Sequence, residues 1–245
     1  MNGYILVDKP KDWTSFDVVA RVRGLVRAAH RQTMAAQSGS SDGSPAGHQQ
    51  LPKRVKVGHT GTLDPQATGL LVILIGKYTK RAPELTKLDK TYEVVMKLGE
   101  TSTTGDVEGE KVPVSDRQPA LEELQTALEA FVGDIMQTPP IYSAIKVDGV
   151  RAYKLAREGK EVKLEARPAR IDSLQLTEYD YPYVRFTVDV SSGTYIRSLV
   201  EDIGSRLKTG AYMSDLRRTR VGQFRLKDAV KVEILQSDSL PVQEL

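Results

Sequence analysis

The chain has 245 residues, of which 40% are hydrophobic and 27% are charged, as is usual for a globular protein with a full core. It contains no cysteine, which excludes disulfides, thiolate-bound metals and a cysteine nucleophile. The net charge of +3 permits a polyanionic partner without demanding one. The longest apolar run, residues 70–75, is far shorter than the roughly 20 residues that cross a bilayer, and the N-terminus does not resemble a signal peptide. We therefore expect a cytoplasmic protein that makes no membrane contact.

The first part of the chain has clear signals for a strand, a helix and a loop. A short apolar run predicts a strand at 4–7, and an amphipathic pattern predicts a helix at 16–28 with Thr14 or Ser15 as its N-cap. Residues 29–54 are rich in Ser, Gly and Gln and almost free of large apolar side chains. They are predicted to form a low-complexity, mobile inserted loop.

The rest of the chain mixes strand and helix patterns in an irregular order. Strands are predicted at 69–75, at 91–98 and within 171–190, helices at 119–132, 152–158 and 196–207, and short closing elements at 221–224 and 230–235. Because strict βαβ alternation is lacking, the pattern favours an α+β fold with a central mixed sheet flanked by helices and loops. We expect a single domain.

Residues 57–71, VGHTGTLDPQATGLL, place one carboxylate between glycines at the start of a buried strand. The glycines at 58, 61 and 69 let the backbone approach a ligand closely, and Pro65 favours an extended Asp64. The loop is therefore predicted to hold the Asp64 side chain where a bound ligand could contact it. The alternative is that Asp64 only caps the turn before Pro65, as aspartate often does.

A second segment, residues 191–199, places a glycine turn, Tyr195 and Arg197 where a strand is predicted to give way to a helix. An arginine close to Asp64 would favour the charged carboxylate, the form that a nucleophile needs. Taken alone, Arg197 could equally be a solvated surface residue. In the same way, Tyr92 taken alone could be a core residue of its strand.

These segments resemble the TruB family of tRNA pseudouridine synthases, which carries a Gly-His-Thr-Gly-X-Leu-Asp-Pro-X-Ala-Thr-Gly loop like residues 58–69 here. The resemblance continues, in family order, over most of the chain. Its further blocks are Val7-Asp8-Lys9-Pro10 with Thr14-Ser15, Lys90-Thr91-Tyr92-Glu93, PPIYSAIK at 139–146 with Gly149 and Tyr153, Gly193-Thr194-Tyr195-Ile196-Arg197, and Leu216-Arg217-Arg218-Thr219.

The resemblance implies a pseudouridine synthase fold, largely antiparallel in its sheet, and isomerisation of uridine 55 in the T-loop of tRNA without guide RNA. It implies that Asp64 is the catalytic aspartate, that Arg197 pairs with it, and that Tyr92 stacks on the target base. Tyr195 and Leu216 would line the pocket, and His59 would contact the T-loop. Residue types leave open whether Asp64 attacks C6 of the uracil or C1′ of the ribose, or acts through a glycal.

A uracil in a T-loop must leave its stack before its glycosidic bond can break, so an aromatic platform and base flipping are expected. Isomerisation changes neither oxidation state nor composition, so no cofactor is needed. His59 has no cysteine or HExxH spacing beside it, which argues against a metal. We expect the T-arm of tRNA as the partner of a monomer with no obligate protein partner.

Basic residues flank these blocks and could neutralise RNA phosphates. The candidates for backbone contacts are Lys77, Lys80, Lys146, Arg151, Lys154, Arg217 and Arg218. Residues 140–162 resemble the family's RNA-gripping insertion. We predict a catalytic domain at 1–235, which includes the 29–54 loop and the 140–162 insertion, and a C-terminal tail at 236–245.

The chain departs from the family pattern in three places. Asp12 stands where members usually have glycine, and aspartate tolerates a left-handed backbone. The 29–54 insert is longer than usual, and we expect the small C-terminal RNA-binding domain of the PUA kind to be lacking. This last departure weighs against a guide-dependent, dyskerin-like synthase, which needs that domain. A tRNA-binding folding helper that acts without turnover is the other alternative.

Overall fold

The computed structural model describes residues 1–38 and 55–244, which divide into two compact units. The first unit comprises residues 1–86 and 218–245, and the second comprises residues 87–217. Strand β12 (Ala211–Val221) contributes its beginning to the second unit and its end to the first. In the described residues, no helix is long and apolar enough to cross a membrane.

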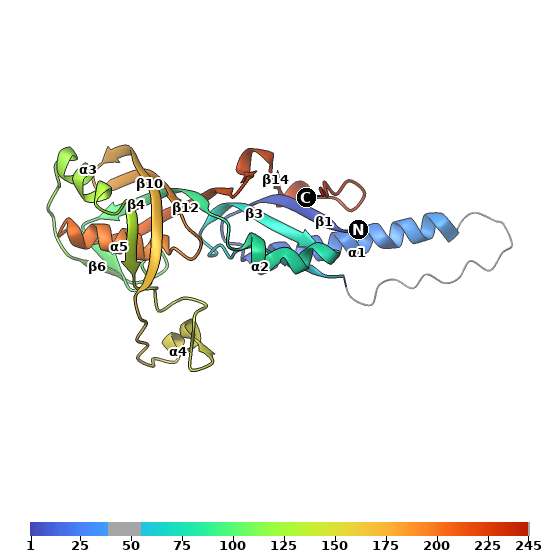
Figure 1. The fold of residues 1–245 in the computed structure, drawn as a ribbon, viewed down its shortest axis with the longest axis horizontal. Coiled ribbons are helices and arrows are strands. Elements are labelled where there is room, and N and C mark those ends of the chain that lie inside the picture. The colour runs from blue at the N-terminus through green and yellow to red at the C-terminus, as the bar shows by residue number, and fades with distance from the viewer. Residues whose placement is uncertain (39–54, 245) are drawn as a thin grey trace. The chain divides into compact units, whose positions relative to one another are not determined.

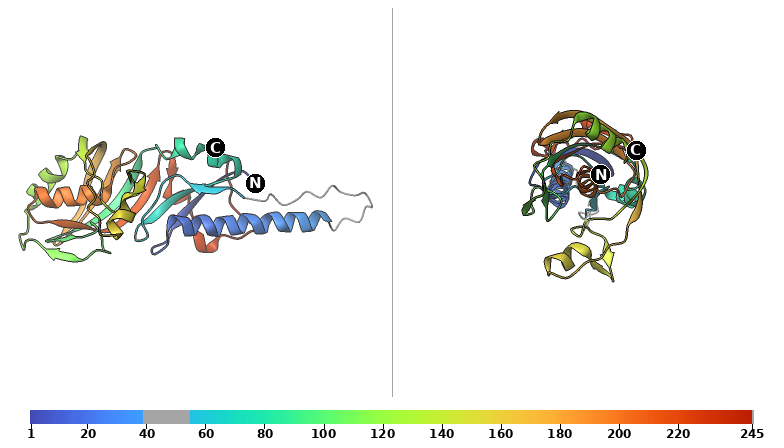
Figure 2. Two further views of the ribbon diagram at one scale, coloured as in Figure 1. Left: turned by 90° about the horizontal axis from the view of Figure 1, so that it is seen from below. Right: turned by 90° about the vertical axis from the view of Figure 1, so that its left-hand side faces the viewer.

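The first unit is a sheet covered by one long helix. Its strand order is β14-β1-β3-β12, with β2 added on β3 and β13 on β12. The helix α1 lies along this sheet (Figures 1 and 2) and buries Val18, Val22 and Val26 against apolar side chains of β1 and β3. The elements are β1 (Gly3–Lys9), α1 (Ser15–Ser38), β2 (Val57–His59), β3 (Thr68–Ile75), α2 (Ala82–Leu85), β13 (Phe224–Arg225) and β14 (Val230–Lys231).

The second unit has the strand order β12-β4-β11-β10-β7, with α3 in contact with β10 and α5. Its main elements are β4 (Lys90–Leu98), α3 (Leu121–Glu129), β7 (Gly133–Gln137), β10 (Arg167–Asp180), β11 (Tyr183–Val190) and α5 (Ile196–Arg206). Two small hairpins, β5 (Glu100–Ser102) with β6 (Lys111–Pro113) and β8 (Lys146–Val147) with β9 (Val150–Arg151), are separate from the sheet. The second hairpin and α4 (Ala152–Arg157) lie in the long connection from β7 to β10 (Figure 1).

The fold confirms the expected α+β class with a mixed, largely antiparallel sheet. Strands β1 and β14 are parallel, whereas β1 with β3, β4 with β11, and β11 with β10 are antiparallel. The predicted double-sided burial of residues 69–75 is also confirmed, because every residue of that stretch is buried.

The predicted inserted loop was wrong for its first ten residues. Residues 29–38 continue α1, which runs to Ser38 rather than ending near Ala28. The reason is local: this stretch, AHRQTMAAQS, has no glycine or proline and several strong helix formers, which outweigh its lack of an apolar face. The remainder of the predicted loop, 39–54, lies outside the described residues.

Candidate active site

The loop that carries Asp64 is tied to the start of α1. The Ser15 hydroxyl is buried and bonds the backbone of Leu63 twice, accepting from its N–H at 2.9 Å and donating to its carbonyl at 3.1 Å. Thr14 caps the helix, because its hydroxyl accepts from the Asp17 N–H while the Asp17 carboxylate accepts from the Thr14 N–H. The two candidate caps thus have separate tasks, and Ser15 fixes the residue just before Asp64.

Lys9 holds the other side of this loop. Its side chain is fully buried, and its ammonium donates to the carbonyls of Pro10, Trp13 and Pro65 at 2.8, 2.6 and 3.1 Å. The Asp12 N–H also donates to the Pro65 carbonyl, at 2.9 Å. Asp12 has φ of 65°, as expected for a residue that replaces glycine in a left-handed turn.

Burial lowers the pKa of Lys9 to about 8, although the nearby Asp64 and Asp12 carboxylates oppose the change. An ammonium ion that is poorly solvated is stabilised by a negative charge beside it, and it stabilises that charge in return. The Asp64 carboxylate therefore favours the protonated form of Lys9 within the same unit.

The Lys9 pKa predicts how stability depends on pH. A lysine in the unfolded chain titrates near 10.5, so between pH 8 and 10.5 the unfolded state binds more protons and the free energy of unfolding rises with pH. The rise is about 3 kcal/mol, at about 1.4 kcal/mol per pH unit. It is measured as the difference in unfolding free energy between the unaltered protein and Lys9→Met, in which this titration is removed. Parallel pH curves for the two proteins would contradict the prediction.

Arg218 lies inside the first unit and braces the loop from β12. Only 1% of its surface is exposed, and its guanidinium donates to the carbonyls of Leu70, Gly61 and Thr62 at 2.8, 3.1 and 3.5 Å. The expectation that Arg218 contacts RNA phosphate was therefore wrong, because its donors are turned inward onto the backbone. Its role is to hold the glycine loop that precedes Asp64.

Gly69 is required for packing against β12. It has φ of 97°, and a Cβ at this position would lie 2.4 Å from the Arg218 carbonyl oxygen. We expected this glycine to let the backbone approach a ligand, but the close neighbour is the protein itself. Any side chain here would separate β3 from the strand that carries Arg218.

His59 lies at the end of β2, before the glycine turn. Its Nδ1 accepts from the Gly61 N–H at 3.3 Å. Burial, followed by the charge of Arg218, lowers the pKa of the imidazole below its usual value, so the ring is neutral at neutral pH. The ring of Phe16 meets it edge to face, with 5.6 Å between centroids.

In the second unit, the aromatic and apolar site candidates are largely buried. Tyr92 on β4 is 8% exposed and Leu216 on β12 is 7% exposed. Tyr195 immediately precedes α5, and its backbone N–H and carbonyl are both bonded by the Gln137 side chain, at 2.8 and 3.0 Å. The predicted junction of strand and helix is confirmed, because β11 ends at Val190 and α5 begins at Ile196.

Arg197 is not a solvated surface residue, which was the alternative that its sequence position left open. It is 7% exposed, and its guanidinium donates to the carbonyls of Thr104 and Tyr142 at 3.1 and 3.0 Å. The carboxylate of Asp106, also buried, lies 3.6 Å from the Arg197 Nη1. The side chain is thus fixed by a charge and two carbonyls.

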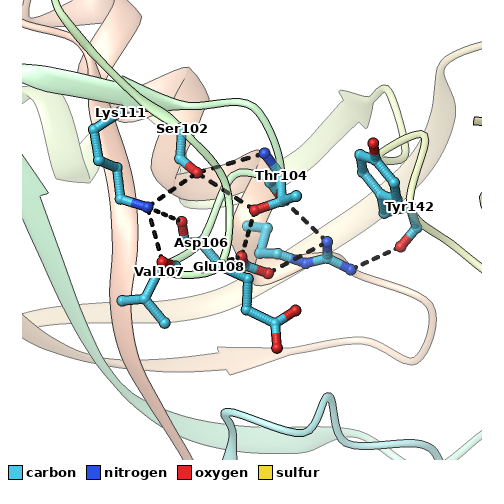
Figure 3. A network of polar contacts seen from close by, with 8 residues as sticks. Ser102, Thr104, Asp106, Val107, Glu108, Lys111 and Tyr142 are labelled. Atoms are coloured by element: carbon cyan, nitrogen blue, oxygen red, sulfur yellow. Dashed lines mark hydrogen bonds and ion pairs between the residues drawn. The ribbon is translucent and has the colours of Figure 1, made fainter. Parts of the chain in front are cut away.

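Asp106 is itself held by the turn in which it lies (Figure 3). Its Oδ1 accepts from the Thr104 hydroxyl at 2.5 Å and from the Glu108 N–H at 3.0 Å, and Lys111 donates to the Asp106 and Val107 carbonyls. The sequence did not point to Asp106 or Lys9 as site residues, and it offered Arg218 only as a candidate for contact with the RNA backbone. A buried position cannot be recognised in Asp106, because Val107 is the only large apolar residue in the stretch 101–110.

The other basic candidates are accessible enough to contact phosphates. The exposed ones are Lys77, Lys80, Lys146, Arg151 and Lys154, whereas Arg217 is half-buried. Among residues 1–38 and 55–244, no group of three histidine or acidic side chains could hold a metal ion.

Two family models together match nearly all of the chain past residue 48. The model for the N-terminal domain of TruB family pseudouridylate synthases matches residues 49–196, and that for the C-terminal domain of tRNA pseudouridylate synthase B matches residues 197–244. These matches define the class of protein as a pseudouridylate synthase, a kind of isomerase.

Individual relatives agree. Proteins named tRNA pseudouridine synthase B are 41% identical in Clostridium novyi and 40% identical in Opitutus terrae, covering 98% of this chain and 74% and 90% of theirs. A structure of a Cbf5-Nop10-Gar1 complex aligns with a TM-score of 0.67 and 28% identity over 94% of this chain and 52% of that chain. The chain belongs to the TruB family.

Proposed function

We propose that this protein isomerises uridine 55 in the T-loop of tRNA to pseudouridine, without a guide RNA. The observation that carries the proposal is the match of relatives named tRNA pseudouridine synthase B over nearly the whole chain, at about 40% identity. The guide-dependent alternative is less supported, because the chain of the Cbf5-Nop10-Gar1 complex is only 28% identical to this one. We also propose that the protein is cytoplasmic and acts as a monomer with no obligate protein partner.

In this proposal, Asp64 is the catalytic carboxylate and Arg197 pairs with it. The positions of both are supported locally: the Asp64 loop is held by Ser15, Lys9 and Arg218, and Arg197 is held by Asp106. The Asp64 carboxylate could attack C6 of the uracil or C1′ of the ribose, or act through a glycal; by each route the N1–C1′ bond breaks and the C5–C1′ bond forms. The C5 proton is lost and N1 gains one, so the composition is unchanged.

The freed uracil must be held while it turns. We propose that Tyr92 stacks on the flipped base and that Tyr195 and Leu216 line the pocket, with His59 contacting the T-loop. A fixed Tyr195 backbone suits this task, since a base that detaches and reattaches needs walls that do not move. Exposed basic residues, including Lys146, Arg151 and Lys154 in the 140–162 insertion, would neutralise phosphates.

The test is pseudouridine mapping by carbodiimide chemistry on an unmodified tRNA transcript, with the protein alone. We expect one new pseudouridine, at position 55. A matched transcript with cytidine at that position controls for the site and should remain unmodified. Conversion elsewhere, or only when a guide RNA is added, would overturn the proposal; binding with no conversion would favour the folding-helper alternative.

A further inference from the structure

Among the large hydrophobic side chains of the described residues, Phe16 is the most exposed, at 69%, and Ile234 follows at 65%. A single exposed hydrophobic residue is common on protein surfaces, so exposure alone has no functional meaning. The surroundings of Phe16 distinguish it from Ile234.

The ring of Phe16 is braced by the ring of His59. The two planes make an angle of 84°, with 5.6 Å between centroids, which is a favourable edge-to-face arrangement. Because the pKa of His59 is lowered by burial and by Arg218, the imidazole stays uncharged at neutral pH. The pair therefore forms an uncharged aromatic corner that is open to solvent on the Phe16 side.

The backbone of Phe16 is fixed relative to the Asp64 loop. The preceding residue, Ser15, bonds both backbone groups of Leu63, and the capping box of Thr14 and Asp17 stops this helix end from fraying. A side chain that is already held loses little conformational freedom when a ligand packs on it. Phe16 is thus a preorganised apolar surface near the candidate catalytic carboxylate.

We propose that Phe16, braced by His59, stacks on an unpaired nucleobase of the T-loop that neighbours the target uridine. The proposal rests on the proposed function, which makes RNA the ligand. A nucleobase that loses its neighbour when the target uridine leaves the stack exposes a π face, and an aromatic side chain can cover that face whatever the base. Phe16 would then contribute to RNA affinity and to keeping the loop open.

The test compares dissociation constants for a T-arm hairpin, measured at fixed salt, with melting temperatures of the proteins. Phe16→Leu keeps the apolar character but removes the π face, and we expect the dissociation constant to rise about tenfold while the melting temperature stays unchanged. Phe16→Tyr should bind like the unaltered protein. Ile234→Ala is the matched control from an equally exposed site in the same unit and should change neither quantity.

A second measurement, of fluorescence, identifies the T-loop base that stacks on Phe16. In hairpins with 2-aminopurine at single unpaired T-loop positions, fluorescence at one position should be quenched by the unaltered protein and by Phe16→Tyr, and not by Phe16→Leu. Unchanged affinity and quenching in Phe16→Leu would overturn this inference and leave the proposed function intact, provided the unaltered protein still converts uridine 55. Failure of the unaltered protein to bind the hairpin would overturn both.

Discussion

Asp64→Asn is expected to abolish pseudouridine formation, with a rate at least about 10³-fold lower, while tRNA binding is retained. The amide has nearly the size of the carboxylate and suits a half-buried position, so the loop should keep its bonds to Ser15, Lys9 and Arg218. What is lost is the negative charge that the carboxylate brings to the reaction, whichever of the three routes it takes. Single-turnover release of tritium from C5-labelled uridine measures the chemical step directly.

Asp64→Glu tests the position of the negative charge separately from its presence. It keeps a carboxylate but moves it by one methylene, and misplacement of about 1 Å can cost about 10²-fold in rate. We expect it to be slow but active, between the unaltered protein and Asp64→Asn. Turnover by Asp64→Asn within tenfold of the unaltered protein would show that another group carries the reaction.

Asp64→Asn also tests the coupling to Lys9. The Asp64 carboxylate favours the protonated ammonium and works against the burial that lowers the Lys9 pKa. Removing that charge should lower the Lys9 pKa further, below about 8, so the rise of stability with pH should begin at a lower pH than in the unaltered protein.

The sequence predicted the elements that present the site better than it predicted the contacts that hold them. The strand at 69–75 and the helix that begins at Ile196 were predicted correctly, because local apolar patterns and turn residues indicate both. Strand β12 was missed because its sequence, AYMSDLRRTRV, carries many charged and polar side chains and does not look like a buried strand.

Arg218 and Asp106 show why such contacts are invisible in the sequence. Arg218 looks like one of several basic surface residues, yet its donors satisfy carbonyls of a loop far away in the chain. Asp106 lies in a mostly polar stretch of sequence, and its partner Arg197 belongs to a distant helix. Whether a charged residue is buried depends on long-range packing, and a periodic pattern contains no information on it.

Asp106→Asn is expected to destabilise the protein by about 1–3 kcal/mol, the usual cost when a buried polar interaction with a charged group loses its partner. Both side chains of the Asp106–Arg197 pair are less than a tenth exposed, so water does not replace the lost carboxylate charge. The free energy of unfolding from denaturant titration measures the loss. Asp172→Asn is the matched control, because it removes the carboxylate of an exposed ion pair, with Arg170, and should cost little.

The same variant should slow catalysis if Arg197 pairs with Asp64 as proposed. Without Asp106, the guanidinium keeps its carbonyl acceptors in Thr104 and Tyr142 but loses the charge of the Asp106 carboxylate, so it is held less firmly. Under conditions in which the variant stays folded, we expect single-turnover rates about 10²-fold lower. Asp106→Glu, which restores the charge, should recover part of both losses. Lost stability with an unchanged rate would mean that Asp106 serves only the fold of the second unit and that the position of Arg197 does not limit the reaction.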